Sequence, residues 1–303
     1  MDSVMLQRMR DAVTTPEELA ATVDYLVQQM NAFLRPVDKV LICFPDDGPC
    51  SLGGLFTAAV RQMKATPILL GEDHRWKTIL KLAFHSRATA IVAPPLVVLG
   101  LTKLAKMTKT PLYFRNVITA GYFCYRWMVD GIKRGLDCDV WGCYDACQDS
   151  MVAGFTCKVC SGIHIRQDKF CFDIQDEGDQ VGDVFISLKS DPTVRLNTFD
   201  RARFSKTTCA CGSTVPLLVD FGPGSDVDEI LLEMGAQFHT WTSILDAYLF
   251  RGECGLELEL VTFPGEKLPK FPTVAKLIVR PWDPERDVPN WFQAGWRNSA
   301  QNG

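Results

Sequence analysis

The sequence predicts an α/β fold in which a parallel sheet with crossover helices is followed by a β-rich subdomain and a C-terminal α+β region. Two observations predict the first two parts. Up to about residue 150, short apolar runs alternate with amphipathic stretches, which is the pattern of parallel strands joined by helices. After that point, apolar and polar residues alternate with period two, as in antiparallel hairpins.

The first half predicts strands and helices in strict alternation. We expect strands at 38–45, 66–72, 88–95, 112–123 and 138–146. We expect the helices between them at 55–64, 74–87, 96–107 and 125–136. Ligands of parallel sheets bind at the carboxyl ends of the strands. The functional edge is therefore expected at PDDGP (45–49), APP (93–95) and YDACQ (144–148).

The second half predicts strands within 162–174, 181–190 and 193–204. A Gly-, Asp- and Ser-rich stretch at 220–229 is typical of a linker or hinge. Beyond it we expect a helix at TSILDAYLF (242–250) and strands at 256–263 and 275–282. The expected domains are a core at 1–221, α/β up to 150 and β-rich from 151, and a C-terminal region with a tail at 222–303.

Composition and charge narrow the class of protein. The 303 residues are 47% hydrophobic and 22% charged, which is typical of a globular chain. The net charge of −4 argues against nucleic acid as a partner, because phosphate binding needs a basic surface. The N-terminal residues resemble no secretory signal, and no uncharged apolar run is long enough to span a membrane, so we expect a cytoplasmic protein without a membrane partner.

Two cysteine motifs lie in the β-rich segment. FTCKVCSGIHI (155–165) contains a C-x-x-C-x-x-x-H unit, and TTCACGSTVP (207–216) contains a C-x-C unit. Such units bring two ligands to one metal ion, and structural zinc sites use four Cys or His ligands. Five candidates compete for four places: Cys157, Cys160, His164, Cys209 and Cys211. The competing interpretation is a set of buried apolar thiols, whereas a redox C-x-x-C fits poorly outside a thioredoxin-like βαβ unit.

Six motifs in matching order make residues 15–262 resemble the phenylacetate–coenzyme A ligase family of adenylate-forming enzymes. Two are the stretches TTPEELAATVDYLVQQMNAFLRPVDKVLI and LGGLFTAAVRQMKATPILL, which resemble a helix and strand and the next βα unit of that family. CYDACQDS falls at its Tyr-Gly-x-x-Glu motif, and FTCKVCSGIH at its Phe-Glu-Cys and Gly-Leu-His. RLNTFD falls at Arg-Tyr-Arg-Thr-Gly-Asp, and CACG at Cys-Pro-Cys-Gly.

The resemblance implies particular site residues. The metal ligands would be Cys157, His164, Cys209 and Cys211, with Cys160 as the alternate. Asp200 would bind the ribose hydroxyls, although an ordinary solvated strand-end aspartate fits the sequence equally. Tyr144 and Trp127 would line the nucleotide and acyl pocket, although either could be a residue of the core.

The chain also departs from the family at several positions that serve the triphosphate. No Gly-rich phosphate loop precedes residue 15, and Asp226 falls where a phosphate-facing arginine is expected, although Asp228 keeps the acid of the hinge. Asp145 replaces the glycine of the Tyr-Gly motif, and Gln148 replaces the magnesium-associated glutamate, so the charge that attracts a hard cation is lost. The expected nucleotide-facing positions are Tyr144, Asp145, Gln148 and Asp200.

The resemblance implies that the C-terminal α+β region at 222–303 is a shortened remnant of the family's lid, followed by a tail. Lys267, Lys270 and Lys276 lie beyond the hinge, but none follows a Gly-rich turn after a complete lid sheet, where the catalytic lysine is expected. Whether the chain is an enzyme is therefore left open by the sequence.

Two functions follow from these observations. The first is formation of an acyl adenylate from a small carboxylic acid with ATP and magnesium, for a partner enzyme or carrier and without thioester formation by the chain itself, as in truncated relatives from antibiotic biosynthesis. The second is a pseudoenzyme or scaffold that keeps structural zinc and an acyl pocket but does not use ATP. The sequence does not identify the acid, and it allows a homodimer.

Overall fold

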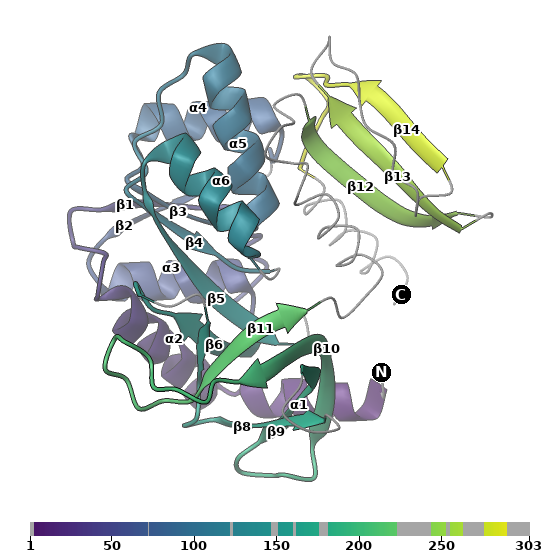
Figure 1. The fold of residues 1–303 in the computed structure, drawn as a ribbon. Coiled ribbons are helices and arrows are strands. Elements are labelled where there is room, and N and C mark those ends of the chain that lie inside the picture. Colours follow the sequence, from purple (N-terminus) through teal and green to yellow (C-terminus); the bar gives the residue numbers. More distant parts are fainter. Residues whose placement is uncertain are drawn as a thin grey trace.

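Eleven strands form one continuous sheet in the described part of the chain, and three more form a separate sheet (Figure 1). The computed structural model describes residues 3–71, 73–121, 124–146, 151–159, 162–175, 181–222, 244–252, 255–262 and 276–289. In the large sheet the strand order is β2-β1-β3-β4-β5-β6-β7-β11-β10-β9-β8.

The first five strands of this sheet run parallel. They are β1 (Lys39–Ile42), β2 (Thr66–Leu69), β3 (Ala90–Ala93), β4 (Asn116–Thr119) and β5 (Asp139–Ala146). The connecting helices are α3 (Leu52–Gln62), α4 (Trp76–Ser86), α5 (Pro95–Thr108) and α6 (Arg126–Leu136), and α2 (Pro16–Met30) precedes β1. The alternation predicted from the sequence is confirmed, although the paired strands are shorter than the apolar runs that predicted them.

Alternate residues of each parallel strand face opposite helical layers. In β1, Val40 and Ile42 pack with side chains of α2 and α3, whereas Leu41 packs with those of α4, α5 and α6. Strand side chains alternate in this way because successive Cβ atoms point to opposite faces. The helices thus cover both faces of the parallel strands.

The remaining strands of the large sheet are antiparallel neighbours. They are β6 (Met151–Thr156), β7 (Ile163–Ile165), β8 (Phe170–Gln175), β9 (Gly182–Leu188), β10 (Arg195–Phe204) and β11 (Leu217–Gly222). The period-two prediction for this segment is confirmed. The N-terminal residues form α1 (Ser3–Val13), whose buried Met9 and Val13 pack in the same hydrophobic cluster as side chains of β5, β6 and β9.

The small sheet contains β12 (Ile244–Gly252), β13 (Gly255–Thr262) and β14 (Lys276–Pro281). The prediction of a helix at TSILDAYLF (242–250) is wrong, because β12 pairs with β13 along its whole length. The segment is rich in β-branched and aromatic residues, and cross-strand pairing with β13 overrides its helical period. The strands predicted at 256–263 and 275–282 are confirmed.

The segment after β14 lies against α4. The backbone N–H of Trp76 donates to the carbonyl of Asp287 at 3.1 Å, and the buried Asp287 carboxylate pairs with Arg280 at 2.6 Å. Trp282 packs on the hydrophobic cluster under α4, α5 and α6. These contacts connect the small sheet to the helical layer that it faces in Figure 1.

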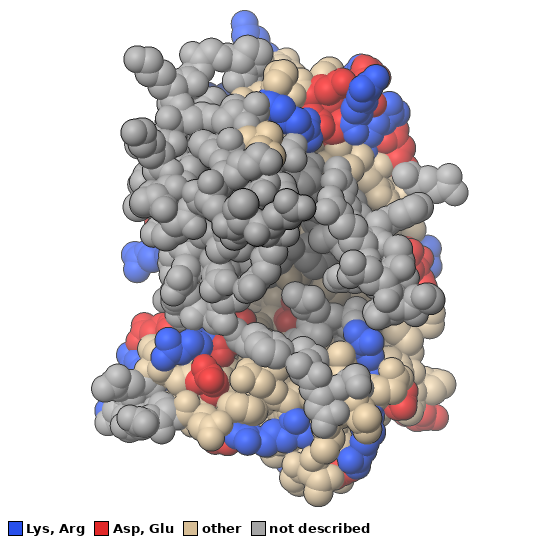
Figure 2. Space-filling view, turned by 90° about the vertical axis from the view of Figure 1, so that its right-hand side faces the viewer, with Lys and Arg blue, Asp and Glu red and all other residues tan. Residues whose placement is uncertain are grey.

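The described surface mixes charges of both signs. Figure 2 shows Lys and Arg side chains interspersed with Asp and Glu side chains on one face. The exposed ion pairs of the described residues include Arg75–Asp73 (2.6 Å) and Arg195–Asp173 (2.5 Å). Among the helices of the described residues, none combines the length and the apolar character needed to cross a bilayer.

Candidate functional site

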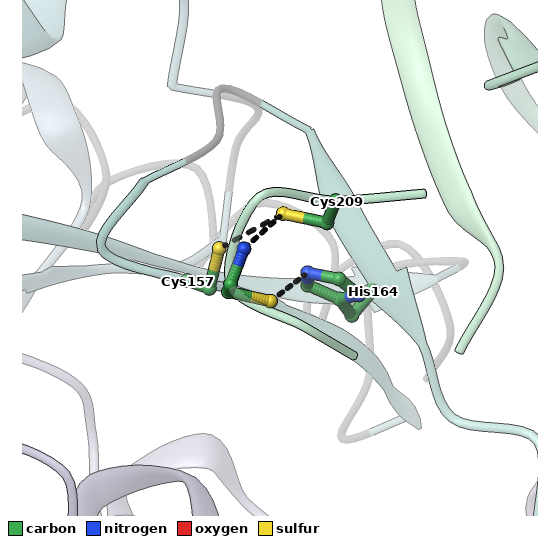
Figure 3. Close-up of side chains that lie close together, drawn as sticks. Cys157, His164 and Cys209 are labelled. Carbon is green, nitrogen blue, oxygen red and sulfur yellow. Dashed lines mark hydrogen bonds between the residues drawn. The ribbon is translucent and has the colours of Figure 1, made fainter. Parts of the chain in front are cut away.

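Two loops and one strand of the antiparallel sheet bring together four side chains of the types that bind metal ions. Cys157 follows β6, His164 lies in β7, and Cys209 and Cys211 lie between β10 and β11. Their ligand atoms all lie within 4.8 Å of one another. Cys157 Sγ lies 3.5 Å from Cys209 Sγ, and Cys211 Sγ lies 3.5 Å from His164 Nε2. Figure 3 shows the sulfur atoms and the imidazole ring pointing toward one another.

These separations fit a tetrahedral zinc ion. Bonds of about 2.3 Å to sulfur and 2.0–2.1 Å to nitrogen place tetrahedral ligand atoms about 3.5–3.8 Å apart. His164 Nδ1 lies 3.4 Å from the carbonyl oxygen of Val215, a partner that orients the ring with Nε2 toward the cluster. Four ligands would close the coordination sphere, which is the arrangement of structural rather than catalytic zinc.

The C-x-C turn is shaped by its own backbone. The N–H of Gly212 donates to the carbonyl of Cys209 at 3.0 Å, and Gly212 has a φ of 83°, a conformation that glycine adopts without strain. The N–H of Ser213 donates to Cys211 Sγ at 3.4 Å. This hydrogen bond is the main cause of the lowered pKa of Cys211, and it favours the thiolate that binds a metal.

A tyrosine and a carboxylate meet at the carboxyl edge of the parallel strands. Tyr144 Oη, near the end of β5, donates to Asp200 Oδ2 of β10 at 2.5 Å. In the sheet, β5 and β10 are separated by β6, β7 and β11, so the sheet must curl for the two side chains to touch. Tyr144 is buried, and the ring of Phe221 lies edge-on to it, with centroids 6.0 Å apart.

A second carboxylate lies beside this pair. The N–H of Gly121, just beyond β4, donates to Asp145 Oδ1 at 3.0 Å. Burial raises the pKa of Asp145 to about 7; the hydrogen bond from Gly121 opposes this shift, and the nearby Asp200 carboxylate adds to it. Near neutral pH, Asp145 is therefore poised between a neutral acid and a second negative charge in the site.

The other residues predicted from the sequence are Trp127, Lys276 and several positions outside the described residues. Trp127 of α6 packs against the cluster under α4, α5 and α6, whereas Tyr144 belongs to a separate cluster. A role of Trp127 in a pocket shared with Tyr144 stays a prediction. Lys276 is the first residue of β14. Several predicted positions lie outside the described residues: Gln148, Cys160, Asp226, Asp228, Lys267 and Lys270.

Several contributing groups could not be found from the sequence. They act through the backbone: the N–H of Gly121, the N–H of Ser213 and the carbonyl of Val215. Gly212 was visible within the CACG motif, but nothing in the sequence connects Gly121 to Asp145.

Comparison with known proteins identifies the fold. No family model matches the chain, and no curated protein matches its sequence. Among solved structures, a 2-hydroxyisobutyryl-CoA ligase in the postadenylation state aligns with a TM-score of 0.63 at 14% identity over 82% of this chain. A benzoate CoA ligase from Burkholderia xenovorans LB400 aligns with a TM-score of 0.58 at 12% identity over 90%. The amide bond synthetase McbA from Marinactinospora thermotolerans gives 0.54 at 14% identity over 91%.

These similarities show that the chain has the fold of adenylate-forming ligases. The chain spans 59%, 65% and 66%, respectively, of the length of these three proteins. The narrower resemblance to phenylacetate–coenzyme A ligases stays a prediction.

Proposed function

We propose that this chain joins a small carboxylic acid to the AMP portion of ATP at the carboxyl edge of its parallel sheet. In this proposal the acyl adenylate passes to a partner enzyme or carrier, and the chain by itself forms no thioester. The observation that carries the proposal is the 2.5 Å contact between Tyr144 Oη and Asp200 Oδ2, in a chain with the fold of adenylate-forming ligases.

The chemistry of the pair supports nucleotide binding. A carboxylate such as Asp200 can accept hydrogen bonds from both hydroxyls of a ribose. Donation by Tyr144 fixes one of its oxygens, and the flat tyrosine ring offers a face for adenine or an acyl group. A solved structure with this fold, the 2-hydroxyisobutyryl-CoA ligase, holds 2-HIB-AMP and CoA.

Pyrophosphate release tests the proposal. The chain is incubated with ATP, magnesium and a panel of aryl and short-chain carboxylic acids, and pyrophosphate is measured. We expect release that depends on one class of acid and falls by about 100-fold or more in Asp200→Ala. Asp173→Ala removes an exposed aspartate of β8 and serves as the matched control, with activity unchanged.

A second candidate function is nucleotide binding without activation. It is favoured by the Asp145 carboxylate, which adds negative charge beside Asp200 where incoming phosphates would need positive charge. In this case the chain is a pseudoenzyme or scaffold. Binding of AMP or adenosine without acid-dependent pyrophosphate release would support it over the first.

A further inference from the structure

A cavity of about 290 Å³ opens at the amino edge of the parallel strands. It is lined from four separate parts of the chain: the turn after α2, the start of β4, the start of β5 and the loop after β6. The lining residues used below are Phe33, Arg35, Arg115, Asn116, Trp141 and Lys158.

This cavity is distinct from the Tyr144–Asp200 site. Asn116 is the first residue of β4, whereas Gly121 lies just beyond its last residue. Likewise Asp139 opens β5, whereas Tyr144 and Asp145 lie near its end. At about 3.3 Å per residue, the two sites are roughly 15–20 Å apart on opposite edges of the same strands.

The base of the cavity is aromatic and fixed. The rings of Phe33 and Trp141 are stacked, with centroids 4.1 Å apart and 12° between the planes. Trp141 Nε1 donates to Asn116 Oδ1 at 3.2 Å, and Asn116 Nδ2 donates to the Phe33 carbonyl at 3.3 Å. Asn116 is only 8% exposed, and these two hydrogen bonds hold its amide between the Phe33 backbone and the Trp141 ring.

Three cationic side chains line the cavity: Arg35, Arg115 and Lys158. Arg115 pairs with Asp38 at 2.5 Å, and Lys158 pairs with Asp139 at 3.4 Å. Asp38 is 2% exposed and its oxygens also accept from Thr89 Oγ1 and from the N–H of Arg35, so it has little capacity left for a ligand.

Hydrogen-bond donors of the cationic side chains therefore outnumber the carboxylate acceptors around the cavity. Each guanidinium carries five N–H donors, and Arg115 uses one of them on Asp38. The side chain of Arg35 adds a third cation against two carboxylates. Guanidinium groups match carboxylate and phosphate oxygens in geometry as well as in charge.

We propose that this cavity binds a small organic anion with a planar body. Its carboxylate or phosphate group would lie against Arg35 and Arg115, and its flat body near the Trp141 ring. The site is independent of the proposed function, because it shares no residue with the carboxyl edge.

The indole N–H of Trp141 reports on the cavity directly. In a protein labelled with ¹⁵N, the seven tryptophans give separate indole cross-peaks, and Trp141→Phe assigns the relevant one. Phenyl phosphate, benzoate and inorganic phosphate are titrated to about 10 mM. We expect the first two to shift the Trp141 peak saturably and to bind more tightly than inorganic phosphate.

Three variants locate the binding. Arg35→Gln should weaken binding by about tenfold, since it removes one charge-assisted contact. Arg61→Gln removes an exposed arginine outside the cavity and should change nothing. Asp200→Ala should also leave the affinity unchanged, which separates this site from the carboxyl edge.

The outcomes that overturn the proposal are equally specific. They are a Trp141 peak that none of the three probes moves, an equal affinity in Arg35→Gln, or an affinity that falls in Asp200→Ala. Binding of inorganic phosphate as tight as that of phenyl phosphate would remove the assignment to planar anions.

Discussion

At the scale of single residues, Asp145 sets the electrostatics of the carboxyl edge. Its partly buried carboxyl lies near Asp200 and accepts a hydrogen bond from Gly121. When Asp145 is neutral, Asp200 is the lone anion of the three side chains. When Asp145 ionises, the site carries two negative charges, and an approaching phosphate is repelled. If the site binds a nucleotide as proposed, the protonation state of Asp145 sets the negative charge that the phosphates of the nucleotide meet.

Asp145→Asn should stabilise the protein above neutral pH. The folded pKa of about 7 exceeds the ordinary 3.8, so the folded state binds the proton more tightly and ionisation costs stability as pH rises from about 4 through 7. Asparagine mimics the neutral acid and can still accept from Gly121. We expect a gain of about 1–2 kcal/mol at pH 8, allowing for the part of the carboxyl that is solvent-exposed.

Urea unfolding of both proteins between pH 5 and pH 8.5 measures this difference. The gain should shrink toward pH 5. Asp173→Asn, at an exposed position of β8, should not stabilise the protein at pH 8. A constant difference across the pH range would mean that Asp145 does not titrate in this window.

The sequence could identify Tyr144 and Asp200 as a pair only through the resemblance to a family. Nothing in their spacing of 56 positions indicates a contact, because the curl of the sheet brings β5 and β10 together. The environment of Asp145 was equally hidden. Its elevated pKa depends on burial and on the backbone of Gly121, which follows a different strand.

At the scale of elements, the cysteine and histidine side chains connect two loops of the antiparallel sheet. The loop between β6 and β7 supplies Cys157, and the loop between β10 and β11 supplies Cys209 and Cys211. β7 and β11 are neighbours in the sheet, with Leu217 opposite His164. A metal ion bound here would therefore link the two loops to each other, in addition to the pairing of β7 with β11.

Protein purified without chelator should carry about one zinc per chain. Replacing Cys209 and Cys211 together by serine should remove the metal and lower the melting temperature by about 10 °C or more, because metal binding contributes directly to folding free energy. Elemental analysis and thermal unfolding check the two parts. Cys171→Ser, an exposed cysteine of β8 outside the cluster, should retain both zinc and stability. Protein without any transition metal would contradict the interpretation.

Helices and strands were predictable where one period of apolar residues dominates the segment. The helices of the first half have an apolar face and a polar face, and the β-rich segment alternates cleanly. The prediction for β12 was wrong because its apolar residues fit a helical period as well as a strand. These residues are Ile244, Leu245, Tyr248 and Leu249. Only pairing with β13, which no local pattern contains, decides between them.

At the scale of the whole molecule, the described segment that follows β14 contacts the layer formed by α4, α5 and α6. Trp282 packs on the cluster under α4, α5 and α6, and Glu285 forms an ion pair with Lys77. Thioester formation in adenylate-forming enzymes requires a lid that moves over the adenylate. These contacts favour a fixed position of the small sheet over movement across the adenylate.

We therefore expect the chain alone to form no coenzyme A thioester. In the sequence, Lys267, Lys270 and Lys276 do not follow a Gly-rich turn after a complete lid sheet, so the positive charge that stabilises the leaving oxygens is not expected in place. The measurement is a thioester assay with ATP, magnesium, coenzyme A and a panel of acids. Product above the no-enzyme control that disappears in Asp200→Ala would identify a working ligase instead.

We infer that Tyr144 and Asp200 form the binding site of an adenosine nucleotide, and calorimetric titration measures this binding. AMP, adenosine and Mg·ATP are titrated into the wild type, Asp200→Asn and the control Asp173→Asn. We expect AMP and adenosine to bind at least as tightly as Mg·ATP, because Asp145 adds no favourable charge for a triphosphate. Asp200→Asn should weaken AMP binding by about tenfold through loss of charge-assisted hydrogen bonds, and Asp173→Asn should not. Absence of binding by all three compounds, or an AMP affinity unchanged in Asp200→Asn, would contradict the claim.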